Sequence, residues 1–319
     1  MKITLKKGSY ESAPKEYVRI AFVDKPKSSR RLIHEKGLEI LEIGVGKPTE
    51  MNLRRFIILC RTIVNAAKQN KFKKIAVQFD RTPELFKNLH GVSLEHISQL
   101  AAENFEMANF EFNRFKTKPK EGFDTVEEIL TYTPELPLGK AVAKGQEIGK
   151  AINACRTLAN TPGSDVTPTS LAKAAKEAVK GLPVKVTVLG VKEMKKIGMG
   201  TILGVAKGSP QAPTFTILEY KGAPGAPIVL AGKGVTFDSG GLNIKTGESM
   251  YEMHMDMSGA ASVIHTVALT ARLKLKKHVI GLIPSVENMP GTDAYRPGDI
   301  LKSHSGKTIE VLNTDAEGR

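Results

Sequence analysis

The alternation of apolar and polar positions predicts a small α/β domain in the first part of the chain. Short runs rich in β-branched residues predict strands at 17–23, 38–43 and 74–79. Apolar residues recur at helical spacing over 53–67, which predicts an amphipathic helix, and 94–107 predicts another. We find no cluster of ligands or nucleophiles in this part of the sequence.

Loop-type residues separate this part from the next. Prolines and glycines at 117–122 and 133–139 are typical of loops, and we expect the second loop to be the domain boundary. Beyond it, 140–158 has helical character that Gly145 and Gly149 interrupt, so we assign a connecting helix. The expected organisation is a small N-terminal α/β domain over 1–135, a connecting helix and loop over 136–168, and a second domain over 169–319.

The second domain also alternates between the two periodicities. A helix running to Val179 can be capped by Thr169 or Ser170, and 258–273 predicts an apolar helix of the kind that covers a sheet. Apolar runs such as IVLA suggest strands that are buried on both faces. The predicted fold class is α/β, with a central mixed, largely parallel sheet in the C-terminal domain whose strands lie at 184–189, 214–220, 228–231 and 279–283.

Length and composition refine this picture. With 319 residues, 41% of them hydrophobic and 25% charged, the chain is an ordinary globular sequence of two-domain size. It has no apolar segment typical of a signal peptide or a membrane span, so we expect a cytoplasmic protein without a membrane partner. Cys60 and Cys155 stand in apolar-periodic segments, which favours reduced core residues.

The formal net charge of +14 is the least ordinary feature. The basic residues form short clusters at 25–31, 68–74 and 114–120, without the interleaved aromatic residues of a single-strand binding platform. We interpret them as a solvated basic surface. A DNA-binding or architectural role is the alternative that the charge leaves open.

Chemistry-bearing residues gather in the last third of the chain. Lys233, Asp238 and Lys245 follow a predicted strand along a glycine-rich loop, where the backbone can approach a ligand closely. In an open α/β sheet, the crevice beyond the carboxyl ends of the strands is the expected ligand site. Each of these residues alone would more often be a turn aspartate or a solvated lysine.

More acidic residues follow in the same region. Asp256 precedes the apolar helix, and the closing NTDAEGR places Asp315 and Glu317 two positions apart, so that both side chains can point the same way. Carboxylates converging on one crevice would repel one another. A pair of divalent ions roughly 3.5 to 4 Å apart removes this repulsion and can activate a water molecule.

Several ordered motifs carry a resemblance to a known family. GKGVTFDSGGLNIK, MDMSGAA and NTDAEGR resemble the successive signatures of the leucyl aminopeptidase, or cytosol aminopeptidase, family. RTLANTPGSDVTPTSLA and KKIGMGTILGVAKGS extend the resemblance, which covers about 140–319 well and the first domain weakly. Family members continue past the last motif. The resemblance therefore predicts that 169–319 is the N-terminal part of a metallopeptidase catalytic domain.

The resemblance implies a role for each residue of these motifs. Lys245 matches the catalytic lysine, and Arg319 matches the arginine that holds a bicarbonate ion. A lysine that coordinates metal must be neutral, so we expect a strongly lowered pKa at Lys233. The implied metal ligands are Lys233, Asp238, Asp256, Asp315 and Glu317.

The implied function is metal-dependent hydrolysis of N-terminal peptide bonds, with a preference for hydrophobic residues such as leucine. The expected cofactors are two divalent ions, manganese or zinc with magnesium as a further option, and bicarbonate. Peptides are the expected substrates, a homo-oligomer (a hexamer in the family) is the expected assembly, and nucleic acid is a secondary partner. Because Asp315 and Glu317 stand beside a terminus that can fray, we expect this chain alone to be inactive or feebly active.

Other polar residues in this region receive a structural interpretation. His254 and His265 lack the partner ligands that a metal needs, and the family site contains no histidine. Met250, Met253, Met255 and Met257 are expected to line the site or fill the core. A catalytically inactive scaffold remains a third alternative, although every expected ligand is present.

Overall fold

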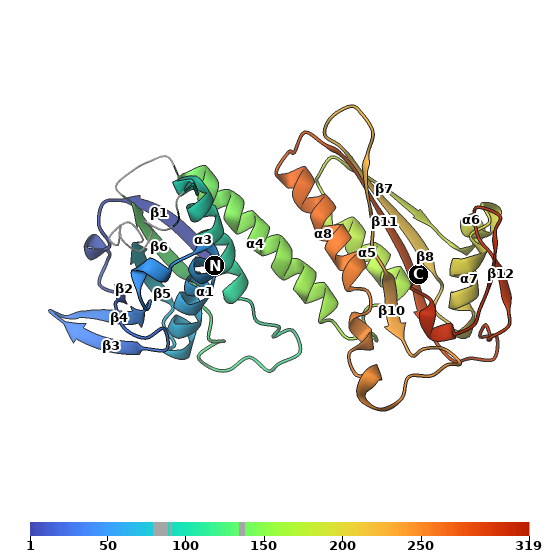
Figure 1. The fold of residues 1–319 in the computed structure, drawn as a ribbon, viewed down its shortest axis with the longest axis horizontal. Helices are drawn as coiled ribbons and strands as arrows, with labels where there is room; N and C mark the ends of the chain where they lie inside the picture. The colour runs from blue at the N-terminus through green and yellow to red at the C-terminus, as the bar shows by residue number, and fades with distance from the viewer. Residues whose placement is uncertain (79–88, 90, 134–137, 319) are drawn as a thin grey trace. The chain divides into compact units, whose positions relative to one another are not determined.

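A computed structural model describes residues 1–78, 89, 91–133 and 138–318 as two compact units, Met1–Asn153 and Ala154–Arg319 (Figure 1). Each unit contains a sheet with helices packed against it. The predicted α/β class is therefore confirmed. No helix in the described ranges is both long and apolar enough to cross a lipid bilayer.

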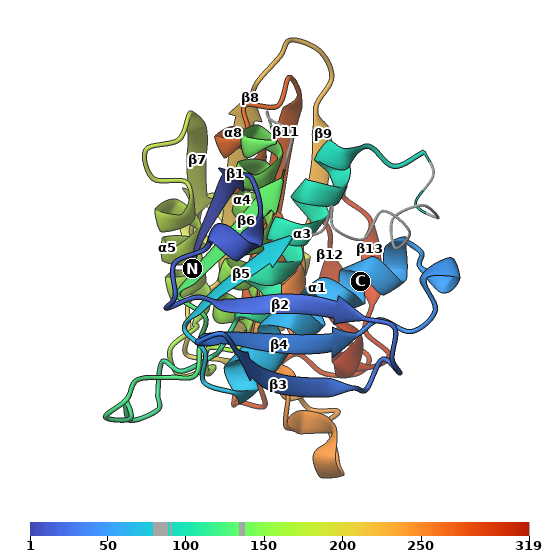
Figure 2. The ribbon, with the colours of Figure 1, turned by 90° about the vertical axis from the view of Figure 1, so that its left-hand side faces the viewer.

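The first unit is built on a six-stranded sheet of described residues. Every neighbouring pair is parallel except the antiparallel β3–β4 hairpin, and Figure 2 shows β2, β4 and β3 side by side. Three of its strands escaped the sequence analysis, and two of them, KITLKK and RRLIHE, are rich in charged residues. In spatial order the strands are β1 (Lys2–Lys7), β6 (Glu128–Thr133), β5 (Lys74–Gln78), β2 (Val18–Val23), β4 (Leu38–Gly44) and β3 (Arg30–Glu35).

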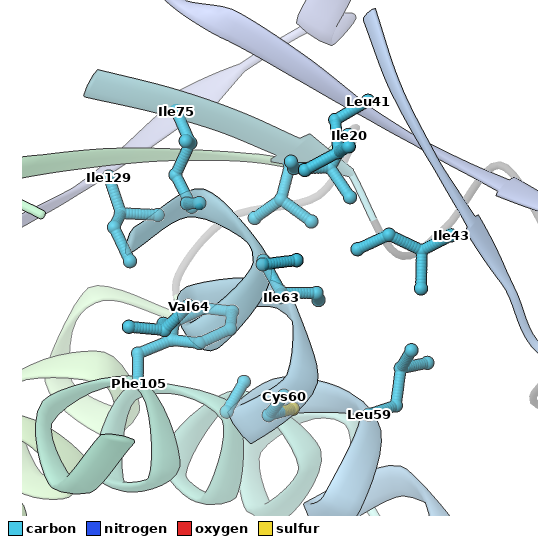
Figure 3. Packing of buried hydrophobic residues seen from close by; sticks show 14 of the residues in the cluster. Ile20, Leu41, Ile43, Leu59, Cys60, Ile63, Val64, Ile75, Phe105 and Ile129 are labelled. Atoms are coloured by element: carbon cyan, nitrogen blue, oxygen red, sulfur yellow. The ribbon is translucent and has the colours of Figure 1, made fainter. Parts of the chain in front are cut away.

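Helix α1 (Leu53–Gln69) supplies the centre of this unit's core. The side chain of Asn52 caps it by accepting a hydrogen bond from the backbone N–H of Arg55 at 3.0 Å. Ile63 on α1 is fully buried and points toward sheet residues such as Ile20 (Figure 3). The predicted amphipathic stripe is confirmed as the face that covers the sheet.

Helix α4 (Gly139–Ala159) runs without a break through both of its inner glycines, although these residues weaken the helical pattern in the sequence. A Cβ at Gly145 would lie 2.0 Å from the carbonyl oxygen of Gln99, and one at Gly149 would lie 2.6 Å from Cβ of Glu106. Both contacts are with α3 (Leu94–Ala108). The glycines therefore permit close packing of two helices.

The second unit has a mixed, partly parallel sheet. Its central strand β11 pairs in parallel with β9 along its first half and with β10 along its second half, and β8 is antiparallel to it. The strands are β7 (Val184–Leu189), β8 (Thr214–Lys221), β9 (Ile228–Ala231), β10 (Gly234–Asp238) and β11 (His278–Asn288).

Helices cover both faces of this sheet (Figure 1). Helices α5 and α8 form one apolar layer with β8 and β11, and α7 contributes to a smaller layer on the opposite face. A short hairpin, β12 with β13, packs beside α7. The bounds are α5 (Pro168–Ala178), α6 (Val191–Lys196), α7 (Gly200–Val205), α8 (Ser258–Arg272), β12 (Ile300–Lys302) and β13 (Thr308–Glu310).

Two local expectations in this unit are wrong. Thr167, and not Thr169 or Ser170, caps α5, because Pro168 occupies the first helical position and the hydroxyl of Thr167 accepts from the N–H of Ser170 at 3.3 Å. The run IVLA is not buried on both faces, since Ile228 is 50% exposed. In the described structure β9 pairs only with β11, so it forms an edge of the sheet.

The burial of both cysteines and of Met257 bears on the packing roles expected from the sequence. Both cysteines are free thiols; Cys60 is fully buried, whereas Cys155 is half-buried, with its Sγ 3.6 Å from Oγ of Ser262. Cys155 is therefore less enclosed than we expected. Met257 is fully buried in the core beneath α8, which agrees with a packing role.

Candidate metal centre

Asp238 lies at the carboxyl end of a strand and not, as the glycines suggested, within a loop. The apolar and β-branched residues Val235 and Phe237 favour extended backbone, and β10 pairs with the end of β11. Asp238 is 2% exposed and stands opposite Asn288 in the register. The carboxylate is therefore fixed by the sheet itself.

The backbone of Lys233 is held in place by the first turn of α8. A Cβ at the preceding Gly232 would lie 2.5 Å from the carbonyl oxygen of Gly259, so glycine is needed where the backbone meets the first turn of α8. The N–H of Ala260 donates to the carbonyl oxygen of Lys233 at 2.8 Å. Asp256 stands just before this turn, and its Oδ2 lies 2.6 Å from Nζ of Lys233.

The NTDAEGR segment is held against the loop that follows β10. Thr314 is fully buried; its hydroxyl donates to the carbonyl oxygen of Gly240 at 2.6 Å, and its N–H donates to Oδ1 of Asn243 at 2.8 Å. Tyr295 donates its hydroxyl to the carbonyl oxygen of Thr314 at 2.7 Å. These bonds hold in place the 3₁₀ turn η6 (Thr314–Ala316), which brings the carboxylates of Asp315 and Glu317 close to Asp238.

The carboxylates of this segment meet those of the strand and the helix. Nζ of Lys233 lies 2.7 Å from Oε1 of Glu317. Nζ of Lys245 lies 3.2 Å from Oδ2 of Asp238 and also donates to Asp315. One oxygen atom each of Asp238, Asp315 and Glu317 lies within 4.8 Å of the others.

Six of the seven residues expected from the sequence are thus brought together in one place. They are Lys233, Asp238, Lys245, Asp256, Asp315 and Glu317. The seventh, Arg319, lies outside the described residues. The group joins segments that are up to 84 positions apart in the sequence, from 233 to 317.

Asn288 is a member of this centre that the sequence analysis missed. Its side chain is fully buried, and its Nδ2 donates to Oδ1 of Asp238 at 2.9 Å and to the carbonyl oxygen of Thr314 at 2.9 Å. A longer contact of 3.5 Å reaches Oε2 of Glu317. The available signal was weak, since Asn288 ends a strand that also contains His278, Ser285 and Glu287.

Burial and the neighbouring carboxylates together set the pKa values of the two lysines in the centre. Burial alone would lower the pKa of Lys233, but the carboxylates of Asp256 and Glu317 beside it outweigh burial and raise that pKa. The pKa of Lys245 is raised in the same way, against burial, by Asp315 and Asp238. The two carboxylates therefore favour the charged form of Lys233, and the lowered pKa expected of this lysine beside two divalent ions stays a prediction.

Asp256 also has a shifted pKa. Burial raises the pKa of its carboxyl group, and repulsion from Asp238 and Glu317 adds to the effect, while Lys233 opposes it. Four carboxylates share two ammonium groups here. The excess of negative charge is the electrostatic condition that favours cations.

The donor set fits divalent metal ions. Oδ2 of Asp256 and Oε1 of Glu317 are buried and accept no well-directed hydrogen bond from the described residues, although Lys233 lies beside both. Carboxylate oxygens with free lone pairs and a nearby amine are suitable ligands for manganese or zinc. The carboxylate cluster contains no histidine among the described residues.

Comparison with known proteins agrees with this arrangement. The catalytic-domain profile of the cytosol aminopeptidase family matches residues 153–319. The N-terminal-domain profile of the same family matches residues 19–119. The chain belongs to the cytosol aminopeptidase family. The first match alone spans more than half of the chain, and the second extends the family to the N-terminal unit, which the motifs covered only weakly.

Curated relatives carry the same family name. A probable cytosol aminopeptidase of Hamiltonella defensa subsp. Acyrthosiphon pisum (strain 5AT) is 41% identical over 292 residues, which are 90% of this chain and 57% of the relative. One from Aeromonas hydrophila subsp. hydrophila is 38% identical over 324 residues, covering 99% of this chain and 61% of the relative. The chain thus spans about three fifths of the length of these family members.

Solved structures share the fold. The bottromycin maturation enzyme BotP is 25% identical, with a TM-score of 0.80 over 94% of this chain and 66% of that protein. A structure of BotP in complex with Mn is 24% identical, with a TM-score of 0.81 over 96% of this chain and 67% of that protein. At this identity the second likeness shows the fold alone.

Proposed function

We propose that this protein is a metal-dependent aminopeptidase of the leucyl aminopeptidase type. Membership of the cytosol aminopeptidase family supports the reaction class. The observation that carries the proposal is the convergence of Asp238, Asp315 and Glu317 within 4.8 Å of one another beside two lysines. Bound divalent ions would supply a Lewis acid for the scissile carbonyl and an activated water molecule.

The chain's own residues perform the remaining tasks in this proposal. Asp238, Asp256, Asp315 and Glu317 would hold two ions, manganese or zinc, with magnesium as a further option. Lys233 would release its proton to become the fifth ligand, which couples metal binding to proton release.

Two further residues would act on the reacting groups. Lys245, which is 14% exposed and already fixed between two carboxylates, would present a positive charge to the oxyanion that forms at the scissile carbonyl. Arg319 would hold a bicarbonate ion that moves a proton to the leaving amine, as the family resemblance implies. The same resemblance supports a preference for hydrophobic N-terminal residues such as leucine.

We expect the 319-residue chain by itself to hydrolyse peptides feebly or not at all. The chain spans only about three fifths of the length of the family members described above. The apolar strand β9 is open to solvent at Val229, which is 52% exposed, so core-type surface is uncovered. The hexamer implied by the family is likewise a proposal for the whole protein, and sedimentation velocity would test it.

Metal binding and hydrolysis can be measured separately on the same protein. The purified chain is stripped with a chelator, and binding of Mn²⁺ or Zn²⁺ is measured by calorimetry, followed by release of p-nitroaniline from leucine p-nitroanilide. We expect two ions to bind per chain and little hydrolysis. Failure to bind either metal would overturn the proposed centre, whereas brisk metal-dependent hydrolysis would overturn only the expected inactivity.

A second candidate function, nucleic-acid binding, is favoured by one observation. Phe115 is 57% exposed within the basic cluster 114–120, and the guanidinium of Arg114 lies 5.2 Å from the centre of its ring. This cluster therefore does contain an aromatic residue, unlike our expectation from the sequence. Binding of DNA that weakens steeply with added salt would support this role, and salt-independent or absent binding would exclude it.

A further inference from the structure

We propose that the N-terminal unit carries a binding site for a small organic anion, one that joins a phosphate or carboxylate group to an apolar body. The site is a cavity of about 220 Å³. Three cationic side chains, Lys27, Arg30 and Arg55, line it together with apolar residues of α1 and the loop before it. This site goes beyond the proposed peptidase centre, which lies in the other unit.

The position of the cavity in the fold is one reason for the proposal. Gly44 and Val45, at the carboxyl end of β4, form one wall, and the first turns of α1 form another. Strand β2 lies between β4 and β5, and the chain passes from β4 through α1 to β5 on the opposite side of β2 (Figure 2). Ligands of open α/β sheets bind beyond the carboxyl ends of the strands, and the cavity lies at this end of β4.

The charges around the cavity are not balanced by the described residues. Glu50 is the carboxylate partner of both Arg55, at 2.7 Å, and Lys27, at 3.6 Å. Arg30 has no carboxylate within ion-pair distance in the described part of the chain. Its Nη1 donates to the carbonyl oxygens of Lys27 at 2.8 Å and Ser29 at 2.5 Å.

The setting of Arg30 strengthens this argument. Burial lowers the pKa of its guanidinium, because no nearby carboxylate compensates for the water that the group has lost. The two carbonyl contacts orient the group but do not neutralise it. A planar guanidinium in this state is suited to a bidentate bond with a phosphate or carboxylate group.

The apolar residues that line the cavity indicate the uncharged part of the ligand. Met51 and Leu59 are buried at 5% and 6% exposure, and Ile58 at the rim is 52% exposed. Inorganic anions gain nothing from such walls, whereas an apolar or aromatic body would cover Ile58 and be removed from water. The walls therefore favour an organic anion over a free inorganic one.

The test uses the whole 319-residue chain and three probes in calorimetric titrations: phenyl phosphate, benzoate and inorganic phosphate. We expect phenyl phosphate or benzoate, or both, to bind, and inorganic phosphate to bind at least about tenfold more weakly. The stronger of the first two identifies the charged group. Equal binding of inorganic phosphate would overturn the organic part of the proposal, and no binding of any probe would overturn the whole.

The chain offers matched controls for the charge. Arg30→Gln should weaken binding at least about tenfold, the loss typical of a hydrogen bond to a charged group, whereas Arg31→Gln removes the same charge from an exposed position on β3 and should change it less than about twofold. Equal losses in both variants would mean nonspecific attraction and would overturn the site. If Arg30→Gln fails to fold by circular dichroism, Ile58→Glu decides: it places a negative charge at the cavity's exposed rim and should also abolish binding.

Discussion

Asn288 and Asp238 face each other across the parallel pair of β11 and β10, and the amide of Asn288 donates to the carboxylate of Asp238 at 2.9 Å. The same amide reaches the carbonyl oxygen of Thr314 and a carboxylate oxygen of Glu317. One side chain thus connects the sheet to the turn that carries the last two acids. The relationship makes Asn288 a positioning residue for the proposed metal ligands.

Replacing Asn288 should weaken metal binding without unfolding the unit. Asn288→Ala removes the amide that orients Asp238 and the turn at Thr314, so we expect Mn²⁺ affinity to fall by about 10-fold to 100-fold, the usual effect of losing a residue that orients ligands. Calorimetric titration of the chelator-treated chain measures this. Asn70→Ala, the same change in the first unit, serves as the control, and equal affinities in wild type and Asn288→Ala would refute the role.

Metal ions should stabilise the second unit. A ligand that binds only the folded state adds about 2.7 kcal/mol when its concentration is 100 times its dissociation constant. We expect Mn²⁺ to raise the unfolding temperature of the chelator-treated chain, and Asp238→Asn or Glu317→Gln to abolish the rise. Glu310→Gln, an exposed change on β13, should leave it intact. A rise that survives Glu317→Gln would place the ion elsewhere.

His265 should make the second unit sensitive to acid. Burial, with a smaller contribution from Arg272, lowers the pKa of His265 from its ordinary 6.5 to about 4, and its Nδ1 has no hydrogen-bond partner among the described residues. Between these values the unfolded chain binds the proton and the folded chain does not. Stability should therefore be complete above pH 6.5 and fall as the pH falls toward 4.

The variant His265→Leu isolates this effect. Relative to it, the wild type should lose free energy of unfolding on the order of 3 kcal/mol between pH 7 and pH 4, since one pKa unit corresponds to about 1.4 kcal/mol. Urea denaturation of both proteins across this range measures the difference. A difference that stays constant with pH would mean that His265 titrates normally in the folded chain.

Gly145→Ala should destabilise the first unit even though alanine is the better helix former by about 1 kcal/mol. The new Cβ would lie 2.0 Å from a backbone oxygen of α3, so the two helices must separate. We expect a loss of about 1–3 kcal/mol, the usual range for overpacking, seen as faster hydrogen exchange in α3 and α4. Gly139→Ala, at the start of the same helix with nothing within 4 Å, should be neutral or stabilising.

The sequence by itself determined the elements with strong local signals. The apolar stripe of α1 and the buried strands β8 and β11 could be predicted, because their periodicity depends on which face each residue buries. Ordered motifs also supplied six side chains of the centre, since their residue types and spacing are a property of the chain alone. Lysine-rich β1 and the glycine-flanked β10 could not be assigned, because pairing with a neighbouring strand stabilises them.

Only the tertiary structure decided how these parts meet. A polar residue at the end of a strand does not by itself reveal the task of Asn288; the register of β10 on β11 places its amide beside Asp238. The inner glycines of α4 weaken its helical pattern in the sequence, and only the structure shows that they allow α3 to pack closely against it. The protonated state of Lys233 likewise depends on Asp256 and Glu317, which lie 23 and 84 positions further along the chain and reach it only through folding.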